Sequence, residues 1–187
     1  MKRVLIPLAN GCEEIEAITL VDVLRRAQCH VTLASIETHI QVTAAHGVGL
    51  QADCFISDCR DETFDLIALP GGMPGSSRLA ECTALIELLN RQRQRLGGIA
   101  AICAAPAVVL GQQGWLKGKN ATGYPAFAQQ LTEQGAKLID QPVVRDGNLI
   151  TSQGPATAML FALELVRYLM GDATAEEIAA GVLLNKM

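Results

Sequence analysis

Two short runs of this sequence contain no polar side chain, and they limit the folds that the chain can adopt. Residues 4–8 read Val-Leu-Ile-Pro-Leu, and residues 66–69 read Leu-Ile-Ala-Leu. Strands that are buried on both faces have continuous apolar runs of this kind, whereas strands with one wet face alternate apolar and polar residues. The two runs therefore predict a parallel sheet that is covered by helices on both sides.

The rest of the sequence alternates strand-like and helix-like segments, which is typical of an open α/β sheet. We predict an α/β, three-layer sandwich with a mostly parallel sheet, and a single domain over residues 1–187, because no repeat or linker interrupts the pattern. Strands are expected at residues 3–9, 30–34, 64–69, 98–102, 142–145 and 149–151, with a side hairpin from residues 41–44 and 48–52. Helices are expected at residues 13–27, 82–95, 104–112, 126–133, 156–170 and 175–184.

Composition excludes several classes of protein. Half of the residues are apolar, so the chain can bury enough surface to fold. The net charge of −4 argues against stable nucleic-acid binding, which needs clustered Lys and Arg. No apolar run approaches the roughly 20 residues of a membrane helix. The run at residues 4–9 is also shorter than the roughly 7–15 residues of a secretory signal core, so we expect a cytoplasmic protein.

Six cysteines stand at positions 12, 29, 54, 59, 82 and 103. No Cys-x-x-Cys pair is present, and no His and carboxylate spacing indicates a metal, so we expect reduced thiols and no metal site. A buried cysteine is usually a small apolar residue. Among the six, only Cys103 has a position in the sequence that indicates a functional role.

Cys103 directly follows the apolar run at residues 99–102 and precedes a helix-forming stretch. Ligands of open α/β sheets bind at the carboxyl ends of strands. A nucleophilic residue at such an end stands on a sharp turn at the N-terminus of the following helix. The positive end of that helix favours the thiolate over the thiol. The alternative is a small core residue at the junction of strand and helix. A second strand end leads into Gly71 and Gly72, whose amides could form an oxyanion hole or simply a turn.

A carboxylate in the first predicted helix falls among apolar residues. Glu16 shares an arc with Leu20, Val23 and Leu24, where a buried carboxylate is usually protonated or hydrogen-bonded. Glu13 lies on the same arc, although it can reach solvent at the helix end, so Glu16 is favoured. A protonated Glu16 beside Cys103 would donate a hydrogen bond and lower the thiol pKa further than a helix terminus can.

None of the three histidines, His30, His39 and His46, follows Cys103 in the sequence. This excludes the order of a strand-end Cys followed by a His that the glutamine amidotransferases use. A pair of Cys103 with His46 stays open, although a histidine on a hairpin is more often a surface residue. We therefore expect a glutamate as the general acid or base.

Five stretches together resemble the ThiJ/PfpI superfamily, most closely its parkinsonism-associated deglycase branch with the bacterial YajL-like proteins. They occur in family order across nearly the whole chain, and they are residues 13–16 (EEIE), 22–27 (DVLRRA), 69–72 (LPGG), 100–106 (AAICAAP) and 151–155 (TSQGP).

The resemblance implies a flavodoxin-like fold, a homodimer, a nucleophilic and oxidation-prone Cys103, and Glu16 as its protonated partner. It also implies an oxyanion hole from the backbone amides of Gly72 and Ala104. Members of the family are described as glyoxalases and deglycases that act on methylglyoxal and glyoxal, or on early adducts of these aldehydes with proteins and nucleotides. Such chemistry needs no cofactor.

The chain departs from the family pattern at three places near the thiol. Tyr124 stands where human-type members have a histidine, His46 appears in place of a pocket arginine, and Gln153 replaces an arginine after Thr-Ser. These departures affect proton transfer and anion binding more than the pair of Cys103 and Glu16. The matching Arg26 is expected to approach the pocket of a neighbouring subunit in the implied dimer.

Two other functions stay open. A redox-responsive chaperone or oxidative-stress sensor would use oxidation of the same Cys103. A protease or hydratase is a weaker alternative, and protease action is disfavoured because no histidine follows Cys103 to protonate an amine leaving group.

Overall fold

A seven-stranded sheet runs through the centre of the molecule, and the computed structural model describes residues 1–184 of the chain. Its strands are β1 (Arg3–Leu8), β2 (His30–Ser35), β5 (Cys54–Phe55), β6 (Leu66–Leu69), β7 (Gly98–Ile102), β10 (Val143–Asp146) and β11 (Leu149–Ser152). They lie in the order β10-β11-β7-β6-β1-β2-β5, and every neighbouring pair is parallel except β10 with β11. The predicted, mostly parallel α/β sheet is confirmed.

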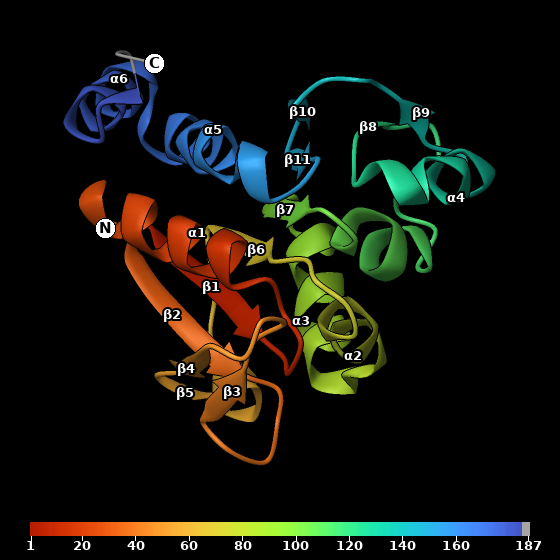
Figure 1. Cartoon of the computed structure of the whole chain (residues 1–187), viewed down its shortest axis with the longest axis horizontal. Helices are drawn as coiled ribbons and strands as arrows, with labels where there is room; N and C mark the ends of the chain where they lie inside the picture. Colours follow the sequence, from red (N-terminus) through yellow and green to blue (C-terminus); the bar gives the residue numbers. More distant parts are fainter. Residues whose placement is uncertain (185–187) are drawn as a thin grey trace.

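Helices cover both faces of this sheet, as Figure 1 shows. The α-helices are α1 (Glu14–Arg26), α2 (Gly75–Glu81), α3 (Thr83–Gln94), α4 (Ala128–Glu133), α5 (Ala158–Met170) and α6 (Asp172–Gly181). The 3₁₀-helices are η1 (Ile56–Cys59), η3 (Pro125–Phe127) and η4 (Pro155–Thr157), and η2 (Pro106–Gly111) is a π-helix. Beside the main sheet, β3 (Gln41–Thr43) pairs antiparallel with β4 (Gly49–Gln51), and β8 (Asn120–Ala121) pairs with β9 (Lys137–Leu138).

The core consists of two apolar clusters, one on each face of the sheet. Along β1, Val4, Ile6 and Leu8 point into the cluster beneath α1, α5 and α6, and Leu5 points into the cluster beneath α3 and η2. Successive side chains of a strand face opposite ways, so a strand between two helical layers must be apolar throughout. This explains the unbroken apolar run at residues 4–8.

The predicted strands and the side hairpin are all present, with ends shifted by two residues or fewer. The helix predicted at residues 104–112 is different, because residues 106–111 form a π-helix that begins after the turn at Cys103. Helix α2 and the short strands β5, β8 and β9 were not predicted. In α2 only one large apolar side chain, Leu79, is buried, so tertiary packing against η2 and α3 stabilises a segment without an apolar period.

Strands β1, β6, β7 and β11 are parallel to one another, so their carboxyl ends meet at one edge of the sheet. The segments that follow β6 and β7 contain Gly71 and Cys103 respectively, and α1 follows β1. The fold thus brings together residues that are up to about 90 positions apart in the sequence.

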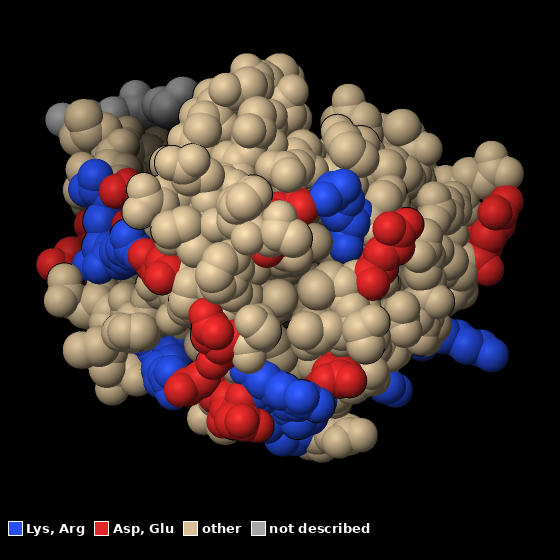
Figure 2. Space-filling model, turned by 90° about the horizontal axis from the view of Figure 1, so that it is seen from below, with Lys and Arg blue, Asp and Glu red and all other residues tan. Residues whose placement is uncertain are grey.

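Basic and acidic side chains lie close together over the face drawn in Figure 2, where Lys and Arg neighbour Asp and Glu. Several ion pairs join basic and acidic side chains at the surface of the molecule, among them Arg3 with Glu62 and Lys2 with Asp65. Within residues 1–184, no helix is both long enough and apolar enough to pass through a bilayer.

Candidate active site

Cys103 stands on a sharp turn directly after β7. Its φ of +64° lies in the left-handed region, which is uncommon for any residue other than glycine. The backbone around it is held on two sides, since its amide donates to the Ser152 carbonyl (3.0 Å) and its carbonyl accepts from the Tyr124 amide (2.8 Å). The strained turn is therefore fixed by β11 and by the segment that follows β8, and the half-buried thiol projects beyond the strand end.

Two backbone amides, those of Gly72 and Ala104, point toward the sulfur of Cys103, and both lower the pKa of its thiol. Gly72 has a φ of +87°, and a Cβ at this position would lie 2.4 Å from the amide nitrogen of Glu13. Glycine is therefore required here, since a side chain would displace the turn from α1. The two amides form a pair of donors at the point where the thiol is located.

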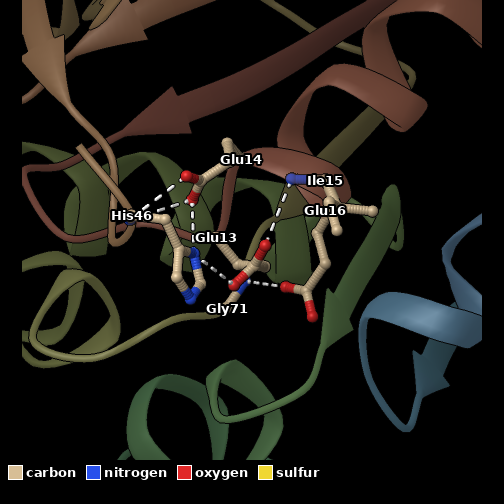
Figure 3. Close-up of polar contacts among 6 residues, drawn as sticks. All are labelled: Glu13, Glu14, Ile15, Glu16, His46 and Gly71. Carbon is tan, nitrogen blue, oxygen red and sulfur yellow. Dashed lines mark hydrogen bonds and ion pairs between the residues drawn. The ribbon is translucent and has the colours of Figure 1, made fainter. Parts of the chain in front are cut away.

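Glu16 is completely buried on the first turn of α1. Its Oε2 accepts a 2.7 Å hydrogen bond from the Gly71 amide, whereas Oε1 is buried and has no hydrogen-bond partner in the described part of the chain. Figure 3 shows this carboxyl group with one oxygen on Gly71 and the other free. An unpaired buried carboxylate oxygen is costly, so Oε1 is the oxygen on which a proton is expected.

Burial raises the pKa of Glu16 to about 7, and the Gly71 amide and the Cys103 thiol act in the opposite direction. Burial, followed by the negative charge of Glu16, raises the pKa of Cys103 to about 12, against the two amide donors. The raised pKa of Cys103 contradicts the sequence-based prediction, which was a lowered pKa for this thiol. The repulsion exists only while Glu16 is ionised, so the two acids titrate as a coupled pair that shares one proton after the first has left.

Glu13 is buried as well, with 7% of its surface exposed, which differs from the expectation that it reaches solvent. It is the N-cap residue of α1, and its side chain accepts a hydrogen bond from the Ile15 amide. Capping of this kind needs a side chain that folds back over the first turn, and this burial follows from that geometry.

His46 lies on the β3–β4 hairpin and contacts the two acidic residues at the start of α1. Its Nδ1 is 3.1 Å from Oε2 of Glu14 and 3.6 Å from Oε2 of Glu13, and its side chain is 71% exposed (Figure 3). The ligand atoms of the three residues lie within 4.8 Å of one another, close enough to hold a cation. Sequence spacing gave no sign of this cluster, because the hairpin supplies His46 from 32 residues away.

The other two departures from the family pattern lie at neighbouring strand ends. Tyr124 is 45% exposed and packs beside Gly154, where a Cβ would lie 3.3 Å from the tyrosine ring. The Gln153 side chain donates to Asp140 (3.0 Å). Arg26 pairs with Asp22 on its own helix (2.7 Å).

Comparison with known proteins gives consistent matches over nearly the whole chain. The model of the DJ-1/PfpI family matches residues 2–168. Protein DJ-1 homolog A of Arabidopsis thaliana is 44% identical over 98% of this chain, although the chain spans only 47% of that relative's length. Glutathione-independent glyoxalase DJR-1.2 of Caenorhabditis elegans is 38% identical over 95% of this chain and 93% of its own. Among solved structures, the oxidized DJ-1 of Toxoplasma gondii has a TM-score of 0.94 and 41% identity, with 98% of each chain covered.

Proposed function

The chain belongs to the DJ-1/PfpI family, and we propose that it is a cysteine-dependent glyoxalase or deglycase that acts through Cys103 and Glu16. The substrates are methylglyoxal and glyoxal, or their early adducts with proteins and nucleotides. One relative is named a glutathione-independent glyoxalase, which supports the aldehyde as substrate class.

The proposal rests on the groups that surround the sulfur of Cys103. Two amide donors, from Gly72 and Ala104, face Cys103, and beside it lies the buried carboxyl group of Glu16, whose Oε1 has no hydrogen-bond partner in the described part of the chain. A nucleophile, a proton carrier and a pair of oxyanion donors thus meet at one strand end. Because the protein groups supply all three, the reaction needs no cofactor.

In the proposed mechanism the single shared proton lies on Glu16 and the charge lies on Cys103. The thiolate attacks the aldehyde carbon of methylglyoxal, and the Gly72 and Ala104 amides hold the oxygen that becomes negative. Glu16 gives its proton to that oxygen and becomes a carboxylate. The carboxylate then takes the proton from the former aldehyde carbon and delivers it to the ketone carbon by way of an enediol, which leaves a thioester. Water hydrolyses the thioester to lactate and releases the thiol, so the net reaction adds one water to the substrate.

Formation of lactate from methylglyoxal by the purified protein, without glutathione, tests this function. Cys103→Ala should abolish turnover, and Glu16→Gln should reduce it by roughly 10²–10⁴-fold, because a proton carrier is lost while the shape is kept. Equal activity of Cys103→Ala and the wild type would overturn the proposal.

A second candidate function, a redox-responsive chaperone or stress sensor, rests on the same half-buried thiol. The Gly72 and Ala104 amides that hold the sulfur can also donate to the oxygens of a sulfinate. This function predicts suppression of protein aggregation that depends on peroxide treatment and is lost in Cys103→Ser. Suppression that is indifferent to peroxide contradicts it.

We also propose a homodimer in the cytoplasm. Ile15 and Ile18 on α1 are 55% and 46% exposed, and neighbouring exposed apolar side chains on one helix are typical of an interface. All six cysteines are free thiols, as expected in a reducing compartment. Light scattering of the purified chain, compared with an Ile15→Glu/Ile18→Glu variant, tests the dimer.

A further inference from the structure

Cys54 and Cys59 form a second thiol cluster, built from other elements than the one around Cys103. Their Sγ atoms are 3.7 Å apart. Cys54 lies in β5, at the edge of the main sheet, and Cys59 is the last residue of η1, which turns the chain back toward that strand. The Cys59 sulfur also approaches the Phe55 carbonyl (3.9 Å). The two sulfurs therefore touch because the backbone places them together.

The two thiols differ in access. Cys59 is 3% exposed and belongs to the apolar cluster beneath α3. Cys54 is only partly buried and lines an open surface depression with Arg25, Cys29 and Asp53. A reagent from solution can therefore reach Cys54 first, and Cys59 is reached through Cys54.

Charge and burial decide which reagent suits this cluster. Burial is the first cause that raises the pKa of both thiols, to about 12 for Cys59, and the carboxylate of Asp58 adds to it at each. The carboxylates of Asp58 and Asp53 act on Cys54, and Arg25 pairs with Asp53, so a small neutral oxidant, which these charges neither attract nor repel, is expected.

We propose that Cys54 and Cys59 are a reversible disulfide-forming site that a small hydroperoxide oxidises. The Cys54 thiolate attacks one peroxide oxygen, an S–O bond forms, the O–O bond breaks, and the other oxygen leaves as water after taking up a proton. The Cys59 thiolate then attacks the Cys54 sulfur and displaces the hydroxyl group as a second water. Two thiols thus lose two electrons and two protons, and hydrogen peroxide becomes two waters.

The second step suits this geometry. The sulfurs must approach from 3.7 Å to about 2.0 Å, the length of an S–S bond. Because the attacking thiol is already in contact, the sulfenic acid on Cys54 is consumed within the same molecule before a second peroxide can oxidise it. A disulfide reductant restores both thiols, in contrast to a sulfinate on Cys103.

Peptide mass spectrometry tests the proposal. The protein carries Cys103→Ser, so that the result does not depend on the proposed function. It is treated with hydrogen peroxide, alkylated and digested with trypsin, which releases residues 27–60 with Cys29, Cys54 and Cys59. We expect this peptide to lose two hydrogens, to keep an alkylated Cys29, and to recover both thiols with dithiothreitol.

Two matched variants separate the steps. In Cys59→Ser the sulfenic acid on Cys54 has no partner, so dimedone should label Cys54 at least about tenfold more than in the parent. In Cys54→Ser the buried Cys59 should stay reduced. Equal dimedone labelling of Cys54 in Cys59→Ser and its parent overturns the proposal, and so does a disulfide to Cys29 or to a second chain.

Discussion

The amide of Gly71 donates a 2.7 Å hydrogen bond to Oε2 of Glu16, and this bond joins the turn after β6 to α1 in the interior. Gly71 also touches the nucleophile, because a Cβ on this glycine would lie 2.5 Å from the Cβ of Cys103 and 2.8 Å from Oε2 of Glu16. The backbone of Gly71, which has no side chain, therefore lies between the thiol and the carboxyl group. The absence of a side chain at Gly71 sets their spacing.

Gly71→Ala should damage the site more than the fold. The new methyl would also lie 2.8 Å from the Ile102 carbonyl, so the strand end must shift. We expect a loss of about 1–3 kcal/mol in the free energy of unfolding, from overpacking. We also expect a loss of about 100-fold in kcat/KM, because thiol and carboxyl group are displaced. Gly49→Ala is the matched control, since nothing lies within 4 Å of a Cβ there. Equal activity in the two variants would contradict this role of Gly71.

Alkylation of Cys103 by iodoacetamide should depend on pH through the coupled pair. We expect the shared proton to stay on Glu16, so that the thiolate forms when the first proton leaves the pair and the alkylation rate rises through about pH 7. If the shared proton stays on sulfur, the rate should rise only toward pH 12. Four of the other five cysteines have raised pKa values, so their thiols also become reactive at high pH and would add to a rate measured on the whole protein. The rate is therefore measured on the peptide that contains Cys103.

Glu16→Gln is the companion variant for this titration. It keeps an N–H donor but loses the stronger O–H donor, so the midpoint should move upward and the rate at pH 7 should fall about tenfold. An unchanged midpoint would show that Glu16 does not hold the proton.

His46 should titrate above its ordinary pKa. The Glu14 carboxylate accepts a hydrogen bond from the ring of His46 and stabilises the imidazolium, so the pKa of His46 is raised. In Glu14→Gln the midpoint of the His46 ring protons, followed by NMR, should move down. Glu62→Gln serves as a control, because that carboxylate pairs with Arg3 instead. A midpoint that is the same in all three proteins would mean that the Glu14 contact is absent in solution.

The sheet and the position of Cys103 at a strand end could be predicted because both depend on local pattern. The apolar run at residues 66–69 indicates a doubly buried strand, and Cys103 follows the next buried strand in space. The apolar arc around Glu16 indicated a buried carboxyl group for the same reason, and Glu16 is fully buried.

The remaining features depend on contacts between distant segments. The π-helix after Cys103 and the contact of His46 with Glu14 arise from tertiary packing and hairpin placement, which leave no local period. The predicted direction of the pKa shift of Cys103 was wrong, because the sequence gives no measure of how deeply the sulfur is buried.

The free energy of unfolding should also report the proton on Glu16. Its pKa rises from 4.5 in the unfolded chain to about 7 in the fold, so the folded state binds this proton more tightly. The resulting stability is fully present below pH 4.5 and is lost as pH rises through 7, by about 3 kcal/mol at most. Glu16→Gln removes this dependence, so the stability of the wild type relative to this variant should fall between pH 4 and pH 8 in urea titrations.

Glu37→Gln gives a control of opposite sign for the same experiment. Arg78 lowers the pKa of Glu37, so its contribution is present above the unfolded pKa and is lost as the solution becomes acidic. The wild type should therefore gain stability over Glu37→Gln as pH rises, while it loses stability relative to Glu16→Gln. Profiles with the same slope for both variants would show that Glu16 is ionised throughout this range, and the proton that the proposed mechanism places on Oε1 would then be missing.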